Sequence, residues 1–439
     1  MAYTVTTSTS WFQRLGSSFR GIVTGVVLVI VGTILLWWNE GNFVKTGDAL
    51  TEAQGVTQQL GDISTVDSSK NGQLVHATGD VATEDMLTDP IFNVSANAIR
   101  IERTVEFFQW VEHSKEEKRQ KLGGGEETVT TYTYEKDWVS KPIDSSRFVD
   151  PNAVKRNQNF ILANIENFKT QATNVSFGAY RLPEFLISSI SGAVPWAVEL
   201  PEETKASLTQ QISQMMPATS AAPSTAVPNT AATQSSSFYN LMEEQVTQPA
   251  APAQELVHVQ ASTIMLSASP GVPQIGDVRI TFKVTHPGTI SILAKLNGET
   301  FEQYRAANGK TVSKLSMGTH SLENMYGEAH SANSTMTWIL RFVGAGLVIV
   351  GLKMVLAPLS VIASVLPILG NIVGAGAGLV STLLGAAWSL LIISIAWLRF
   401  RPIVGVGMLV VAAILIGLVV MRGRGAKAPA PASDATPEV

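Results

Sequence analysis

Two groups of residues in this chain have types and spacings that could support chemistry. The stretch GNIVGAGAG, residues 370–378, is dense enough in glycine to wrap a phosphate. His76 and His258 lie in similar short sequences, QLVHATG and ELVHVQA, and would raise the case for an enzyme if the fold paired them beside a carboxylate in a cleft. The acidic pairs at 116–117 and 126–127 lie in expected loops and carry little information about carboxylate catalysis.

The surroundings of the glycines favour helix packing over phosphate binding. A Walker loop needs Lys and then Ser or Thr after its last glycine, but Gly378 is followed by Leu-Val-Ser, and a dinucleotide fold would need an acidic residue where Leu398 stands. Small residues instead recur every four positions, which on a helix forms a smooth stripe that a second helix can approach closely. The predicted packing residues are Gly370, Gly374, Gly378, Thr382 and Ala386, with Gly21 and Gly25 at the same spacing near the N-terminus.

The other candidates do not combine into a catalytic or cofactor site. The six histidines form no HExxH or other close metal-ligand spacing, and two strand histidines such as His76 and His258 are more often structural. Cysteine is absent, which excludes disulfides and thiolate chemistry, and the net charge of −4 gives no footprint for nucleic acid. We therefore predict no catalytic residue, metal, cofactor or nucleic-acid partner.

The first apolar run, residues 21–38, contains no charged residue and is long enough to cross a bilayer. Trp37 and Trp38 end it as interface anchors, because indole rings prefer the boundary between lipid and water. A cleaved signal peptide is the alternative, and Arg14 and Arg20 fit the basic flank of either. No small-residue cleavage site follows the run, so we expect a retained helix.

The C-terminal third is apolar and predicts three more spans, at 338–357, 372–397 and 402–421. Pro367 and Asn371 interrupt the middle of this region, so residues 359–370 are expected to form an interfacial or re-entrant segment. Four charged residues near the ends of the spans are predicted interface anchors that reach toward the headgroups: Arg341, Lys353, Arg399 and Arg401.

An even number of spans puts both termini in the cytoplasm. Basic residues precede the first span in segment 1–20 and follow the last in segment 422–439, as the positive-inside tendency favours. Arg399 and Arg401 then lie on the opposite side, which a five-span arrangement would reverse at the cost of exporting the basic C-terminal segment. We prefer four spans.

Residues 39–337 then form a large β-rich extracytoplasmic domain. Segments 98–113 and 128–139 alternate apolar and polar residues and predict a hairpin with a long polar tip. The charged run HSKEEKRQK in this tip is interpreted as a solvated loop, and a docking surface is the alternative. Segments 152–168 and 181–194 look helical. Residues 217–252 are rich in Ala, Pro, Ser and Thr and predict a flexible insertion. The similar sequences QLVHATG and ELVHVQA make an internal duplication possible, but a short match of this kind can also arise by chance.

Several motifs together carry a family resemblance: WWNEG, KTGDALTEAQ, NGQLVHATGDVATEDMLTDP, VEFFQWVE, TYTYEKDW, IGDVRITF, NSTMTWILRFVGAGLVIVGLKM and RFRP. In this order they cover most of the chain, which resembles the LUMA family, also called the transmembrane protein 43 family. The resemblance implies four spans, two cytosolic ends and a large exported domain. Eukaryotic members of the family belong to the endoplasmic reticulum and inner nuclear membrane, a role that we do not carry over to this chain. It further implies an oligomerising scaffold, for which ion conduction has also been proposed, and no catalytic residues.

The chain departs from the family at the Ala/Pro/Ser/Thr-rich insertion and lacks obvious nuclear or retention signals. A bacterial inner membrane with a periplasmic domain is therefore expected, or the endoplasmic reticulum and nuclear envelope if the cell is eukaryotic.

The sequence thus predicts an α+β integral membrane protein with four transmembrane helices, one N-terminal and three C-terminal. Its leading function is a non-enzymatic scaffold that forms homo-oligomers in the lipid bilayer and binds other membrane or extracytoplasmic proteins. A channel or transporter that uses the broken segment at Pro367 and Asn371 is the second hypothesis, and an enzyme is the third.

Overall fold

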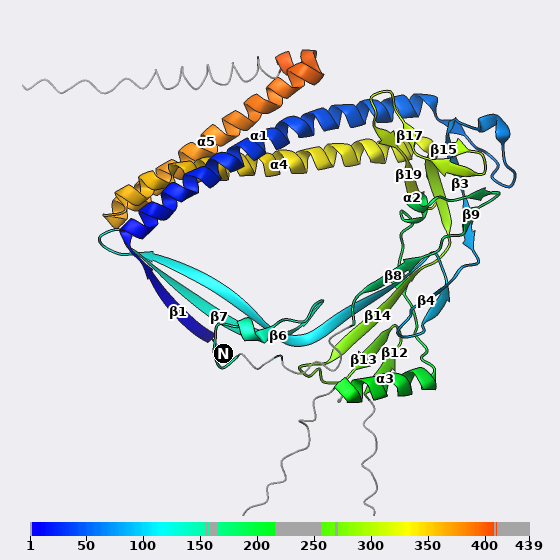
Figure 1. Ribbon diagram of the computed structural model, residues 1–439. Helices are drawn as coiled ribbons and strands as arrows, with labels where there is room; N and C mark the ends of the chain where they lie inside the picture. The colour runs from blue at the N-terminus through cyan, green and yellow to red at the C-terminus, as the bar shows by residue number, and fades with distance from the viewer. Residues whose placement is uncertain are drawn as a thin grey trace, which may run out of the picture.

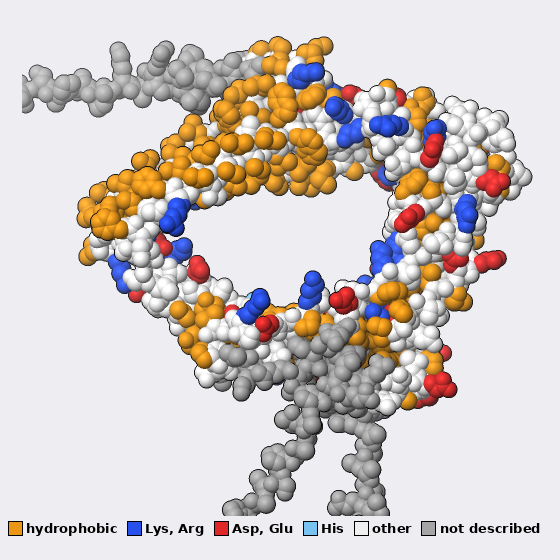
Figure 2. Space-filling model, viewed as in Figure 1, with side chains coloured by type: hydrophobic (Ala, Val, Ile, Leu, Met, Phe, Trp, Pro, Cys, Tyr) orange, Lys and Arg blue, Asp and Glu red, His pale blue; other side chains and the backbone are white. Residues whose placement is uncertain are grey.

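The computed structural model describes residues 2–153, 157, 165–215, 256–267, 271–407 and 410. These residues form a closed ring (Figure 1). Three long helices make one side of it, a β-rich region makes the far end, and a long β-hairpin returns along the other side. A space-filling view shows the opening through the ring, with apolar side chains gathered on the helices and charged side chains along the hairpin (Figure 2).

The helices confirm the membrane character of the chain. Among the described residues, three helices are long and apolar enough to cross a bilayer: α1 (Trp11–Val56), α4 (Leu322–Ala363) and the greater part of α5 (Pro367–Phe400). A capping box between Ser10 and Gln13 starts α1, because their side chains satisfy backbone N–H groups that have no helical partner. The helix then extends well beyond the apolar run at both ends.

The connection between α4 and α5 differs from the predicted interfacial or re-entrant segment at 359–370. Helix α4 continues to Ala363, a turn of three residues follows, and α5 starts at Pro367, where a missing N–H costs nothing. Asn371 lies inside α5 and does not break it. The predicted fourth span, 402–421, begins as a helical segment at 402–407, but most of it lies outside the described residues.

Two β-sheets form the far end of the ring. The larger sheet has the path β1 (Ala2–Thr9), β7 (Glu126–Val139), β6 (Arg100–Gln120), β14 (Val278–Thr285), β13 (Thr263–Leu266) and β12 (Val257–Gln260), with β8 (Phe168–Gln171) on β6 and β11 (Val194–Pro195) on β14. The second sheet contains β19 (Lys314–Met317), β15 (Thr289–Asn297), β16 (Thr300–Glu302), β10 (Tyr180–Arg181), β9 (Val175–Phe177), β3 (Leu74–Thr83) and β2 (Gln58–Gln59). Because β15 also pairs with β3, five of these strands close into a small barrel.

The remaining elements are short. Strands β4 (Met86–Thr88) and β5 (Ser95–Asn97) pair with each other, as do β17 (Tyr304–Arg305) and β18 (Thr311–Val312). Helix α2 (Glu184–Ile187) is a single turn, and α3 (Glu202–Met215) packs beside β12. Two 3-10 turns lie at Ser68–Lys70 and Ser145–Arg147.

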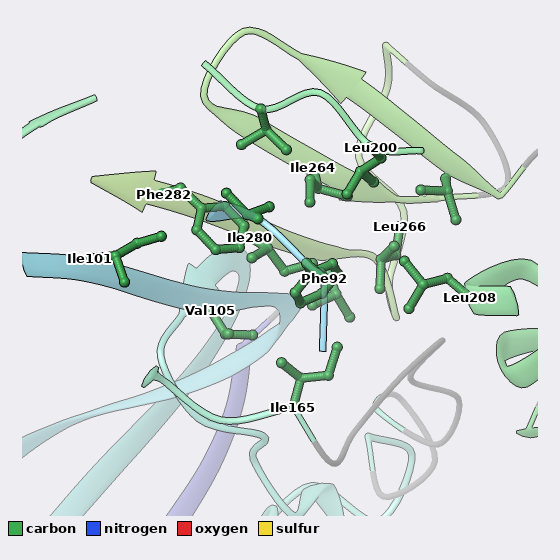
Figure 3. Packing of buried hydrophobic residues seen from close by; sticks show 14 of the residues in the cluster. Phe92, Ile101, Val105, Ile165, Leu200, Leu208, Ile264, Leu266, Ile280 and Phe282 are labelled. Atoms are coloured by element: carbon green, nitrogen blue, oxygen red, sulfur yellow. The ribbon is translucent and has the colours of Figure 1, made fainter. Parts of the chain in front are cut away.

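Each sheet has its own apolar core. Figure 3 shows the core of the larger sheet, where Phe92 and Phe282 meet edge to face with centroids 5.8 Å apart. The barrel encloses a second core, which includes Val75, Phe177 and Ile292. A third core joins the barrel to the ends of the helices, through residues such as Leu50, Leu293 and Tyr326. Helices α1, α4 and α5, which we call the stem, are therefore anchored to the barrel by buried apolar contact.

The predicted hairpin is present but has a much shorter tip. Strands β6 and β7 pair from Phe107–Val139 as far as Gln120–Glu126, so the charged run at 113–121 is almost entirely strand and not a solvated loop. The pairing is possible because β7 is rich in Thr and lies between two strands, β6 on one side and β1 on the other.

Other sequence predictions for the domain have mixed outcomes. Segment 181–194 forms only the single turn α2 and otherwise extended chain, because its apolar residues are buried in the barrel core without needing a helical period. Most of segment 152–168 and all of the insertion 217–252 lie outside the described residues. Strands β3 and β12 occupy different positions, inside the barrel and at the edge of the larger sheet, so the two LVH sequences do not mark equivalent strands.

The ring closes where the hairpin tip meets the start of α1 and the α4–α5 turn. Arg14 donates to the Gly124 carbonyl at 2.6 Å and lies 3.3 Å from the Glu126 carboxylate. The Trp11 indole donates to the Val361 carbonyl at 2.9 Å. The contact joins segment 1–20, predicted to be cytoplasmic, to part of the domain predicted on the opposite side. Both assignments hold only if the hairpin itself passes through the plane of the membrane.

Candidate functional site

Helices α1 and α4 pack antiparallel along a seam of small residues. An added Cβ on Gly25 would lie 2.6 Å from the Gly351 carbonyl oxygen, and one on Gly32 would lie 2.8 Å from that of Gly344. One further step of seven residues along each helix brings Asn39 to Thr337, where the Asn39 amide donates to the Thr337 carbonyl at 3.1 Å. The seam therefore repeats every seven residues, the period of left-handed helix pairs, and it needs glycine for backbone contact.

The predicted glycines of α1 lie at or beside this seam. Gly25 is a contact residue, whereas an added Cβ on Gly21 would only come within 3.8 Å of the terminal methyl group of Met354. Three seam residues escaped the sequence prediction: Gly32, Gly344 and Gly351. Their signal was present as two glycine pairs seven residues apart, while the prediction looked for a spacing of four.

The predicted stripe on α5 divides between two faces of the helix. Gly370 packs against Ser364 in the turn, and an added Cβ on Gly374 would lie 3.6 Å from the Cβ of Ser360 in α4. Gly378 has no atom within 4 Å of an added Cβ, Thr382 is exposed and Ala386 is partly buried. The close contact with α4 is instead made at Gly385, where an added Cβ would lie 2.6 Å from the Ile349 side chain. Thr382 therefore does not pack on α1 or α4 within the chain, because a row of residues four apart drifts around the helix away from α4. Its contact with a helix of another molecule stays a prediction.

A buried ion pair joins the three helices at the domain end of their apolar segments. Glu40 is 0 % exposed, and its carboxylate receives two hydrogen bonds from Arg341, at 2.6 and 2.7 Å. The Trp397 indole donates to the same carboxylate at 2.5 Å. The Arg341 guanidinium also lies 4.7 Å from the centre of the Trp338 ring. Glu40 of α1, Arg341 of α4 and Trp397 of α5 thus satisfy one another's hydrogen bonds, and Trp338, which is 54 % exposed, adds a ring contact to the guanidinium.

This cluster corrects the prediction that Arg341 is an anchor reaching toward lipid headgroups. Its side chain is only 13 % exposed and turns inward because Glu40 supplies a counter-charge. Glu40 was missed as its partner, although it lies only two residues after the first apolar run, in the motif WWNEG.

The other predicted anchors lie at the surface of the helices. Trp37 and Trp38 are 39 % and 56 % exposed, and Lys353 and Arg399 are exposed. Arg401 approaches the Asp48 carboxylate of α1 at 3.3 Å.

The two histidines do not come together. His76 on β3 is buried and contacts Gln59 at 2.8 Å and the His320 carbonyl at 3.0 Å. His258 on β12 contacts the Ser267 carbonyl at 3.1 Å, in the other sheet. Burial lowers the pKa of His76, because the charged imidazolium would lose water. Among the described residues no group of three or more His, Cys, Asp or Glu could hold a metal ion.

Comparison with known proteins places this arrangement in a family. The family model described as transmembrane protein 43 matches residues 107–402, from β6 to the end of α5. The chain belongs to the transmembrane protein 43 family. It is 23 % identical over 403 residues to transmembrane protein 43 of Rattus norvegicus, covering 90 % of this chain and 88 % of that one.

Two further relatives of the transmembrane protein 43 family cover nearly the same length. The protein of Homo sapiens is 23 % identical over 425 residues, with 94 % of this chain and 92 % of the relative covered. The homologue of Drosophila melanogaster is 24 % identical over 423 residues, with 91 % and 94 % covered. No solved structure matches the chain. The matched region of the family model contains Arg341 and Trp397, two of the groups that enclose Glu40.

Proposed function

We propose that this member of the transmembrane protein 43 family is a non-enzymatic multi-pass membrane scaffold. It would form homo-oligomers in the bilayer and hold other membrane or extracytoplasmic proteins through its β-rich domain. In this proposal both termini are cytoplasmic, and the β-rich domain is periplasmic in a bacterial inner membrane, or luminal in the endoplasmic reticulum and nuclear envelope of a eukaryotic cell.

The observation that carries the proposal is the division of α5 into two faces. One face packs on α4 through Gly385 and on α1 through the Trp388 indole, which donates to Thr33 at 2.9 Å. On the opposite face, an added Cβ on the exposed Gly376, nine residues before Gly385, would meet no atom within 4 Å. Exposed apolar side chains surround this notch, including Leu379 and Leu383, which are 64 % and 62 % exposed. A helix of a neighbouring protein could approach closely there and gain dispersion contacts that lipid provides less well.

The stem that carries this face is fixed to the domain at both ends. The ion pair of Glu40 and Arg341 ties it together near the barrel, and the contacts of Arg14 and Trp11 close the ring at the other end. A frame with such fixed ends would hold bound partners at a constant spacing, which suits a scaffold.

The mass of the purified protein in lipid nanodiscs tests the proposal. We expect the wild type to give multiples of the 47.0 kDa chain, and Gly376→Leu to give a smaller mass at an unchanged unfolding temperature. Gly385→Leu is the matched variant on the packed face of the same helix, and it should lower the unfolding temperature instead. A wild type that stays monomeric at all protein concentrations would refute self-assembly.

The geometry does not favour a channel built on a broken helix. Helix α5 runs without interruption from Pro367 to Phe400, and Asn371 is an exposed residue near its start. Ion flux into sealed liposomes should therefore be the same for the wild type and Asn371→Leu. A flux that disappears in the variant would restore the channel hypothesis.

A further inference from the structure

A cavity of about 320 Å³ lies where the stem meets the β-rich domain. It is bounded by α1 around Thr46, by α4 around Tyr326 and by the segment 310–314, which contains β18. The described residues that line it include Lys310 and Lys314 and no Asp or Glu. A concave site with positive charge and no lining carboxylate favours an anion as its ligand.

The two lysines of this cavity differ in how their charge is compensated. Lys314 donates to the Glu328 carboxylate at 2.7 Å and to the Met325 carbonyl at 3.1 Å. Lys310 donates to the side-chain oxygen of Asn42 at 2.5 Å and forms no ion pair within the described part of the chain. An ammonium group has three N–H donors, so Lys310 keeps both an uncompensated charge and donors for a ligand.

The loop that carries Lys310 is fixed to α1. The Asn308 amide donates to the Lys45 carbonyl at 2.7 Å, and the Glu52 carboxylate accepts from the Ala307 N–H at 3.0 Å. The ammonium group is therefore held beside α1 before any ligand arrives. A ligand that binds there does not have to order the loop.

The face of α1 that leads to the cavity becomes apolar toward the middle of the helix. Asn42, which accepts from Lys310, lies four residues after Trp38 and eleven after Val31, so the three share one face of α1. Trp38 is 56 % exposed and Val31 is 47 % exposed. An amphiphile with its anionic head in the cavity would therefore lay its chains along this face.

We infer that the cavity binds the phosphate of an anionic phospholipid, with Lys310 as the group that donates to it. A free phosphate would satisfy the same ammonium group but would leave the apolar face of α1 unused. Lys and Arg side chains also gather where the apolar surface of the helices meets the domain (Figure 2), and they would attract an anionic headgroup. The site uses none of the α5 residues on which the proposed self-assembly depends.

Native mass spectrometry of the purified protein in neutral detergent, titrated with phosphatidylglycerol, tests the inference. We expect Lys310→Gln to weaken the binding of phosphatidylglycerol about tenfold, because a hydrogen bond to a charged group is lost. Lys310→Arg should retain most of the binding, since a guanidinium also donates to phosphate. Arg305→Gln is the matched control and should bind like the wild type, because it removes a positive charge from an exposed position of the same β17–β18 pair outside the cavity.

Two measurements on the wild type keep the test decisive if Lys310→Gln does not fold. Phosphatidylcholine should bind about tenfold less tightly than phosphatidylglycerol, because its choline cation offsets the phosphate charge. Raising the salt concentration should weaken the binding of phosphatidylglycerol. Equal affinity for the two lipids would overturn the inference without any variant.

The remaining outcomes separate the lipid site from its rivals. Lys310→Gln that binds phosphatidylglycerol as well as Arg305→Gln does would overturn the site. Inorganic phosphate that raises the unfolding temperature as much as phosphatidylglycerol would assign the cavity to a free anion and overturn the lipid. The oligomeric mass in nanodiscs is a separate readout, so the scaffold can fail while the lipid site holds, and the reverse.

Discussion

At the scale of single residues, Glu40 is the residue of the three helices whose substitution should lower the stability of the protein most. Its carboxylate has no exposed surface and depends on Arg341 and Trp397 for all of its recorded hydrogen bonds. Removing one member of a buried ion pair leaves the other charge without compensation, whereas removing both charges together costs far less.

We therefore expect Glu40→Gln to destabilise the protein by about 3 kcal/mol or more. Arg341 would keep a buried charge with only the weaker dipole of an amide beside it. Glu40→Gln combined with Arg341→Gln should recover part of that loss. Thermal unfolding of both variants in one detergent measures this. A single variant as stable as the wild type would show that water reaches the cluster.

His76 gives the domain a dependence on pH. Burial holds its pKa below the ordinary value of 6.5, so the unfolded chain binds a proton more readily than the folded protein. This contribution to stability is complete above pH 6.5 and is lost as the pH falls from there toward the lowered pKa. We expect the unfolding temperature to fall between pH 7 and pH 5, and to fall less in His76→Gln. Parallel slopes in the two proteins would exclude His76 as the cause.

At the scale of elements, the α1–α4 seam converts a spacing of seven residues into backbone contact. Gly351 sits where the two helices are closest, with the Gly25 carbonyl oxygen 2.6 Å from an added Cβ and the Val29 side chain at 2.8 Å. Gly346, on the same helix, has no atom within 4 Å of an added Cβ. The two glycines therefore form a matched pair for substitution.

We expect Gly351→Leu to separate the helices and reduce folded yield, with a loss of about 2–3 kcal/mol, because a side chain cannot enter a backbone contact without moving the helix. Gly346→Leu should have almost no effect, since leucine there faces open space. Unfolding temperatures and yields in detergent compare the pair. Equal losses in both variants would mean that leucine perturbs insertion and not the seam.

At the scale of the whole molecule, closure of the ring depends on the hairpin tip. Gly124 has a φ of +80° and an added Cβ would overlap the Trp11 indole, so this position needs glycine for both conformation and space. Its carbonyl accepts from Arg14, which joins the tip to α1.

Gly124→Val should therefore open the ring and leave the two domain cores intact. Val5 of β1 and Thr130 of β7 are register partners, so a disulfide between Val5→Cys and Thr130→Cys should form in the closed ring and less efficiently in Gly124→Val. We also expect proteolysis of the hairpin between Lys115 and Lys121 to become faster. The unfolding temperature of the domain should stay within about 1 °C of the wild type, because the tip lies outside both cores. Unchanged crosslinking would show that the ring closes without this contact.

The sequence determined the features that depend on local composition and period. Long apolar runs with few charges predicted membrane helices, and three of them are confirmed among the described residues. Alternation predicted the hairpin of β6 and β7, and the order of short motifs predicted the family. These signals are local, because a bilayer-length helix or a paired strand imposes its own pattern on neighbouring residues.

Only the tertiary structure decided which residues meet over long distances in the chain. Glu40 and Arg341 are each a single charge beside an apolar run, and nothing local shows that they pair across three hundred residues. The sequence contains small residues both four and seven positions apart. The antiparallel register of α1 and α4 brings the glycines spaced by seven into contact. The pairing of β1 with β7, and with it the closed ring, depends on where the hairpin tip ends relative to α1. Contacts of this kind are set by the relative placement of whole elements, which no single segment encodes.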